Sequence, residues 1–297
     1  MDQLNTFEDR KNDRLDTKDK LETVVSQGTS IIAGSNLVIE DTPIGEHEVE
    51  IMRSLINVTF PSSSDEDVKS KTHLALAGRF AHKFGDALKA TGNPAYADLN
   101  SDLLEIAALG HDLGRSITHR ALRHDIAGDM VLTQLGMRKD IVAAMPSALA
   151  HTKITRRFLH EFRSHHPNAS PEELQRALKS LAQQTLVDSS IEERIVLISD
   201  ICGKPGDGLK GIRTFEGVMD YHRTTRGNYE KASGRKILFP SDRHIDPDVI
   251  DFTEHLYRLH KDWLASEGVD VEEIRKGILE DEEKVHKSIQ SNPDNSI

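Results

Sequence analysis

The sequence lacks disulfide-forming cysteines, membrane-length apolar runs and an excess of basic residues. Its single cysteine excludes an intramolecular disulfide, which fits a reducing compartment. No uninterrupted apolar run approaches the length that a membrane span needs, and the first residues are charged rather than apolar. We therefore expect a cytoplasmic protein with no membrane partner.

The formal net charge of −11 argues against general nucleic-acid binding, which normally requires a basic surface. A local basic site could still bind a small anionic substrate despite the overall sign. With 297 residues, 37% of them hydrophobic, the chain can bury one generous core or two small ones. We find no internal repeat and no low-complexity tract.

Apolar residues recur at helical spacing along most of the chain, which predicts an all-α fold. Residues 1–45 carry many charges and no sustained period, and we expect a mobile N-terminal arm. A helical core is expected over 46–205, followed by a C-terminal helical extension over 206–297 that packs on it. The expected helices cover about 46–58, 67–90, 103–109, 117–136, 137–150 with a kink at Pro146, 152–166, 210–232 and 270–288, and others begin near 171, 191 and 247.

A His-Asp pair ends the most apolar of the early helices. Residues 103–109 run directly into His111 and Asp112, and Gly114 could end the helix in a left-handed turn. A buried imidazole and carboxylate are costly unless something satisfies them. A divalent metal would satisfy both, whereas a salt-linked His-Asp pair at a helix end is the simpler alternative.

Other polar residues share this property of lying on, or ending, an apolar helix. His73 falls on the apolar face of the helix 67–90, whereas His82 is expected to face outward. Asp200 lies in a helix that is apolar on nearly every side, so it requires a cation, either a metal or an Arg. His124 precedes Gly128 by one turn, where a neighbouring backbone could approach closely, and His151 precedes a basic stretch.

The order His…His-Asp…Asp, with the pair inside Ala-Ala-Leu-Gly-His-Asp-Leu-Gly-Arg, resembles the HD superfamily of metal-dependent phosphohydrolases, and most closely its HDIG-type subgroup. The resemblance covers about residues 70–205 and implies an HD-domain helical bundle with extra N- and C-terminal helices. It departs from the family pattern at Gly110, where a bulky aliphatic residue is usual, and at Leu113, which replaces Ile. By resemblance, one divalent metal would be bound by His73, His111, Asp112 and Asp200. His124 and His151 would hold a second metal that Asp112 bridges.

The resemblance implies hydrolysis of a phosphate ester, such as a nucleotide, by hydroxide formed on one or two divalent ions. Manganese, nickel, zinc, magnesium and iron are all compatible with the ligand types. His111 and Asp112 would be central to catalysis. The expected phosphate-binding residues are Arg115, Lys153, Arg156 and Arg157, although the last three could equally form a solvated face.

Two other functions are compatible with the same residues. HD-fold di-iron oxygenases use a similar six-residue set, and a non-catalytic nucleotide-binding sensor could be built on the same scaffold. The expected partner is a small phosphorylated substrate, and a homo-oligomer is left open. The glycine-containing segment 203–208 lacks the spacing of a phosphate-binding P-loop.

Overall fold

The computed structural model describes residues 18–61, 64–117, 124–145, 148–206, 211–221 and 247–291. Throughout these ranges the regular structure is helical, and the only extended pairing is an isolated bridge between Pro205 and Ile212. The expectation of an all-α fold is therefore confirmed. Among the same residues, no helix has the length and apolar character that crossing a membrane requires.

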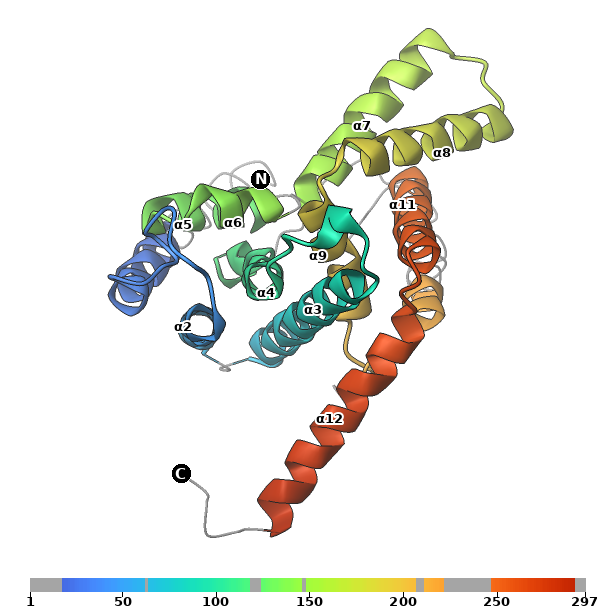
Figure 1. Ribbon diagram of the computed structural model, residues 1–297. Coiled ribbons are helices and arrows are strands. Elements are labelled where there is room, and N and C mark those ends of the chain that lie inside the picture. Colours follow the sequence, from blue (N-terminus) through green and yellow to red (C-terminus); the bar gives the residue numbers. More distant parts are fainter. Residues whose placement is uncertain are drawn as a thin grey trace.

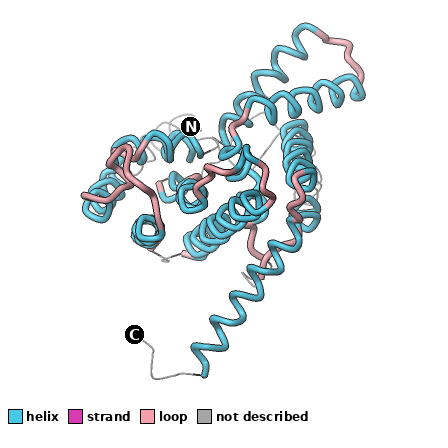
Figure 2. Tube along the Cα trace, viewed as in Figure 1, coloured by secondary structure: helices cyan, strands magenta, loops and turns pink. Residues whose placement is uncertain are grey.

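Helices account for most of these ranges (Figures 1 and 2). Their bounds are 18–32, α2 Glu46–Thr59, α3 Asp65–Ala90, η1 Pro94–Tyr96, α4 Ser101–Gly110, η2 Leu113–Ser116, α5 His124–Leu135, α6 Lys139–Ala144, α7 Ala148–His165, α8 Pro171–Asp188, α9 Ile191–Cys202, 215–221, α11 Pro247–Ser266 and α12 Val271–Ser291.

Side-chain caps fix where several helices begin. Ser170 starts α8 and Ser190 starts α9, each accepting a hydrogen bond from the backbone of Glu173 or Glu193 in a reciprocal capping box. In both helices the capping box satisfies two backbone groups that the first turn would otherwise leave unpaired.

The region around Pro146 differs from the expected kinked helix. α6 ends at Ala144, and Met145 has extended backbone geometry, which is the conformation that a following proline favours. α7 then runs as one helix from Ala148 to His165. His151 therefore lies in the first turn of α7 rather than at the end of a preceding helix.

α3 and α4 pack side by side at the centre of the molecule (Figure 1). Gly78 and Gly85 of α3 face α4, where an added Cβ would lie 3.0 Å from Leu109 and 2.8 Å from Leu104. The missing side chains let the two helices approach closely. Apolar side chains of α3 and α4 form one cluster with those of α8, α9, α11 and α12. They form a second cluster with those of α2, α5 and α6.

Residues 18–45 pack on the second cluster from the helix 18–32 onward. Ile32 and Leu37 are almost fully buried there, and Val24 and Ile44 are mostly buried. The backbone carbonyl oxygens of Asn36 and Thr42 accept hydrogen bonds from Arg138, which fastens this turn to the start of α6. Residues 1–17 lie outside the described ranges.

Two features project from the centre. α7 and α8 form a hairpin, and α8 packs along α11. α12 runs past α3, where Ile278 is buried, and then continues beyond the core (Figure 1).

Candidate metal centre

Four of the predicted site residues converge where α3, the end of α4 and α9 meet. His73, His111, Asp112 and Asp200 each offer one ligand atom, and these four atoms all lie within 4.8 Å of one another. His73 and Asp112 are buried, Asp112 to 2% exposure, and Asp200 is 9% exposed. The four donors come from segments distant in the sequence, so tertiary packing assembles the cluster.

Backbone carbonyls orient both imidazoles. His73 Nδ1 donates to the Gly203 carbonyl oxygen at 3.1 Å, and His111 Nδ1 donates to the Ala108 carbonyl oxygen at 2.6 Å. When Nδ1 carries the proton of a neutral imidazole, Nε2 presents its lone pair. Both Nε2 atoms point into the cluster, which is the orientation that a metal-ligating histidine needs.

The Asp200 carboxylate is the point on which the two rings converge. Its Oδ1 lies 2.9 Å from His73 Nε2 and 3.3 Å from His111 Nε2. Asp112 Oδ2 lies farther away, 3.9 Å and 3.6 Å from the same nitrogens. Lone pairs of oxygen and nitrogen at this separation require a proton or another cation between them.

Each carboxylate also has a basic side chain beside it. Arg115 Nε donates to Asp112 Oδ2 at 2.5 Å, and Lys204 Nζ donates to Asp200 Oδ1 at 2.6 Å. The Lys204 ammonium also lies 3.1 Å from His73 Nε2. The sequence indicated that Asp200 needs a cation, and here Lys204 supplies one.

Burial and these charges shift the pKa values of the cluster. Burial, together with the Lys204 ammonium, lowers the pKa of His73. Burial opposes a low value for Asp200, but the Lys204 ammonium and the two neighbouring imidazoles hold its pKa well below the usual range. His111 has a raised pKa because Asp112 and Asp200 outweigh its burial. This low pKa favours the carboxylate form of Asp200 beside the two imidazoles.

The end of α4 differs in detail from the expected left-handed turn. α4 stops at Gly110, His111 is its C-cap, and Asp112 leads into the 3₁₀ helix η2, which contains Gly114. The pair therefore lies just after the last helical turn. A Cβ added at Gly128 of α5 would lie 3.4 Å from the Gly114 backbone nitrogen, so the close approach expected near Gly128 is present.

The donor set fits a divalent metal. His111 Nε2 is buried and, within the described part of the chain, has no hydrogen-bond partner. A buried polar atom without a partner is costly, and a metal bond would satisfy it. Two imidazole nitrogens and two carboxylates are an ordinary ligand set for zinc, manganese or iron.

The remaining predicted site residues are only partly described. The side chains of His124, His151, Lys153 and Arg156 lie outside the described residues, although α5 begins at His124 and α7 contains the other three. Arg157 is exposed and pairs with Glu161 of its own helix at 2.9 Å. Within the described ranges, no contact joins Arg157 to the four-residue cluster.

Sequence reasoning missed two residues near the cluster. Lys204 follows Asp200 by four positions, and that spacing was its only signal. Tyr257 of α11 is buried, and the charges of Asp200 and Asp112 add to its burial in raising the pKa of its phenol well above the usual value. α11 packs on α9, so the C-terminal helices contribute to the surroundings of the centre.

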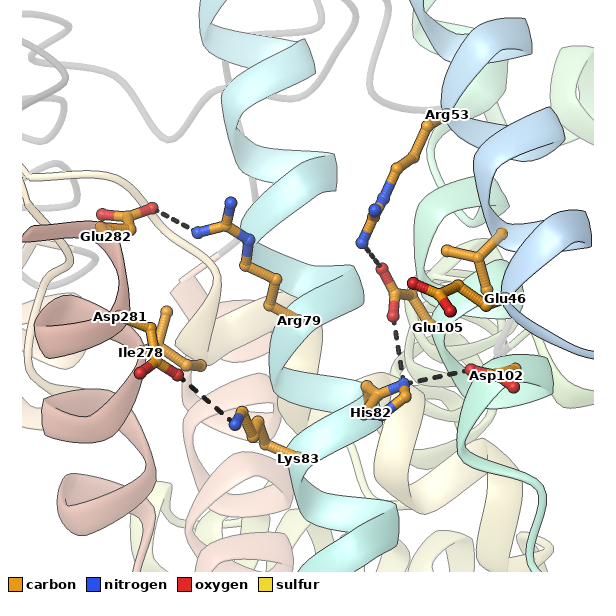
Figure 3. A pocket seen from close by; sticks show the side chains of 11 residues that line it. Glu46, Arg53, Arg79, His82, Lys83, Asp102, Glu105, Ile278, Asp281 and Glu282 are labelled. Atoms are coloured by element: carbon orange, nitrogen blue, oxygen red, sulfur yellow. Dashed lines mark hydrogen bonds and ion pairs between the residues drawn. The ribbon is translucent and has the colours of Figure 1, made fainter. Parts of the chain in front are cut away.

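A separate groove of about 710 Å³ lies between α2, α3, α4 and α12 (Figure 3). Its walls include Arg79 and Lys83, which pair with Glu282 and Asp281 of α12. None of the four cluster residues lines this groove.

Comparison of the chain with protein-family models, with curated proteins and with solved structures gives no match.

Proposed function

We propose that this chain is a metal-dependent phosphohydrolase of the HD superfamily that cleaves a phosphate ester such as a nucleotide. The observation that carries the proposal is the convergence of His73, His111, Asp112 and Asp200 within 4.8 Å. The order of these residues along the chain, with the His-Asp pair at a helix end, is the order that the family resemblance implies.

A divalent ion in this site would acidify a coordinated water and neutralise charge on a phosphoryl group. The chain's own contribution is to hold the ligands in place. The Gly203 and Ala108 carbonyls fix the ring orientation of His73 and His111, so both Nε2 atoms face Asp200 before any ligand arrives.

Asp112 and Arg115 would act together at the substrate side. Arg115 is partly exposed while its Nε donates to the buried Asp112 carboxylate. The planar fork of a guanidinium matches the oxygens of a phosphate, which is the contact that we assign to a partly exposed arginine at this site. We assign Arg115 to phosphate binding, with Lys153, Arg156 and Arg157 of α7 as further candidates.

A second metal ion would require His124 and His151, as the resemblance implies. α5 begins at His124, and η2, which follows Asp112 directly, packs against that helix. The start of α5 is consistent with a second ligand beside the first site. One ion is the minimum that the four-residue cluster supports, and two is the proposal by resemblance.

The test is the metal content of the purified protein, followed by assays of phosphate esters and nucleotides with that metal. Asp112→Ala should reduce metal-dependent turnover by more than about 100-fold, because changing even an outer partner of a metal ligand costs 10–100-fold. Helix content by circular dichroism should stay unchanged. Asp281→Ala, which removes a half-exposed carboxylate on α12, is the matched control and should retain turnover.

Three results would contradict the proposal. Full activity in Asp112→Ala would show that the four-residue cluster takes no part in the reaction. Two irons with oxygen consumption would favour the di-iron oxygenase, and nucleotide binding by metal-loaded protein without turnover would favour the sensor.

A further inference from the structure

The Lys204 ammonium lies inside the ligand set itself. Its Nζ is 2.6 Å from Asp200 Oδ1 and 3.1 Å from His73 Nε2, and these two ligand atoms are 2.9 Å apart. The ammonium therefore contacts a carboxylate and an imidazole that the proposed metal would also use.

His73 cannot contact the Lys204 ammonium and bind a metal ion at the same time. Its Nδ1–H donates to the Gly203 carbonyl, so Nε2 has one lone pair to offer. That lone pair can accept a hydrogen bond from Lys204 or bind a metal ion, but it cannot do both. A metal bound by His73 therefore requires the ammonium to leave.

The backbone of Lys204 is held firmly. Its amide donates to the Ile201 carbonyl and its carbonyl accepts from the Arg213 amide at 3.1 Å, while Pro205 forms an antiparallel bridge with Ile212. Any displacement of the ammonium must consequently occur within the side chain.

The Lys204 side chain can move toward solvent. Lys204 is 27% exposed, more than the 12% of the Asp200 side chain beneath it. A lysine carries its charge on a flexible four-carbon stem, so rotation about side-chain bonds moves Nζ toward solvent without moving the backbone.

We propose that Lys204 is an internal competitor of the metal: its ammonium holds Asp200 and His73 when no metal is bound and is displaced into solvent when a divalent ion binds. This inference rests on the proposed function and concerns how the same site is regulated. The cluster remains charge-paired without a metal, because Arg115 and Lys204 each offset one carboxylate. Metal occupancy then depends on an exchange of one cation for another.

The first test measures Mn²⁺ binding from the electron paramagnetic resonance signal of the free ion, for the full chain and for Lys204→Met. The variant should bind Mn²⁺ about tenfold more tightly or better, because apparent affinity falls with the fraction of molecules whose site is accessible. Without Mn²⁺ its Tm should be below that of the unmodified chain, since Asp200 loses its partner, and saturating Mn²⁺ should close this gap.

Lys83→Met is the matched control. It also removes one lysine charge, from the pair between Lys83 and Asp281, so it reproduces the change in net charge away from the centre. Its affinity for Mn²⁺ should equal that of the unmodified chain. Equal gains in both variants would mean that long-range charge causes the effect and would overturn the proposal.

A second measurement needs no variant. Acetylation of lysines by an active ester, read by mass spectrometry, should increase severalfold at Lys204 when Mn²⁺ is bound and stay constant at Lys83. Constant labelling of Lys204 would overturn the inference even if Lys204→Met does not fold.

The outcomes separate this inference from the proposed function. If the unmodified chain binds Mn²⁺ and Lys204→Met binds it equally or less tightly, only the competition by Lys204 is refuted. If folded protein binds no Mn²⁺ with or without Lys204, the metal centre itself is refuted. Binding only in Lys204→Met would support both.

Discussion

At Gly203 the loop after α9 crosses α3 so closely that a Cβ atom would lie 2.6 Å from the Ala77 backbone nitrogen. This contact is with backbone, which cannot move aside as the end of a flexible side chain can. The same glycine supplies the carbonyl that accepts from His73 Nδ1. The position therefore links packing of the loop to the orientation of a proposed ligand.

We predict that Gly203→Ala lowers the free energy of unfolding by about 1–3 kcal/mol, the usual cost of overpacking. It should also weaken Mn²⁺ binding, because the loop and its carbonyl must shift. Urea denaturation and Mn²⁺ titration measure the two effects.

Gly277→Ala is the control for Gly203→Ala. A Cβ at Gly277 meets nothing within 4 Å, and alanine in a helix is more stable than glycine by roughly 0.5–1 kcal/mol. Equal effects of the two substitutions on stability would show that Gly203 is not crowded.

The sequence predicted the four proposed ligands but not the lysine that lies among them. Each of His73, His111, Asp112 and Asp200 was recognisable as a polar residue in an apolar helical context. The resemblance to the HD superfamily implied that these four form one ligand set, and the structure brings all four together. Lys204 was not recognisable, since a lysine in a glycine-containing loop has no periodicity to indicate its direction. Its placement depends on the Gly203 contact with α3, which is tertiary.

His82 of α3, which the sequence predicts to face outward, lies beside α4 and contacts its carboxylates. It follows His73 by nine residues, half a helical revolution around α3, but its side chain points toward Asp102 and Glu105 of α4 (Figure 3). Its Nδ1 is 3.2 Å from Glu105 and 3.5 Å from Asp102, and its Nε2 is 3.4 Å from Asp86 of its own helix. The expectation that His82 faces solvent was therefore incomplete.

These carboxylates make His82 a pH-dependent link between α3 and α4. The neighbouring Glu105 carboxylate, against a smaller opposing effect of burial, raises the pKa of His82. A histidine whose pKa is raised in the folded state stabilises the folded protein. This stabilisation is fully present below the unfolded-state pKa of about 6.5, and it is lost as the pH rises through the folded-state pKa. Arg53, the other basic partner of Glu105, stays charged throughout.

We predict that His82→Gln destabilises the protein more at about pH 6 than at about pH 9, because only the protonated imidazole attracts the surrounding carboxylates. Denaturant unfolding at the two pH values measures the difference. His160→Gln, at an exposed position of α7, should show no comparable dependence. A constant difference across the range would refute a role for His82 protonation.

Helix boundaries were predictable where local chemistry sets them. The starts of α8 near 171 and of α9 near 191 were predictable because the capping boxes of Ser170 and Ser190 are local. The start of α7 was not, because Pro146 fixes only where α6 must end. Likewise the 3₁₀ turn after Asp112 replaced the left-handed turn that Gly114 would have allowed, a choice the sequence alone leaves open.

For the molecule as a whole, a bound ion should act as a stabilising ligand. Anything that binds the folded chain alone adds RT ln(1 + [L]/Kd), about 2.7 kcal/mol at a concentration of 100 times Kd. We predict that Mn²⁺ raises Tm and that a chelator reverses the rise. Asp200→Asn should abolish it, since both imidazoles converge on this carboxylate. A Tm insensitive to Mn²⁺ in the unmodified chain would contradict the proposed centre.

The four proposed ligands come from three separate segments, so the site forms only when these segments pack together. A fragment covering residues 64–117 contains three of the four donors and both α3 and α4, yet it lacks the α9 carboxylate on which the imidazoles converge. Such a fragment should not hold an ion in the same way, because it lacks the Asp200 carboxylate. A site with all four ligands therefore requires α9 to pack against α3 and α4, and an ion bound there would join distant segments much as a covalent cross-link does.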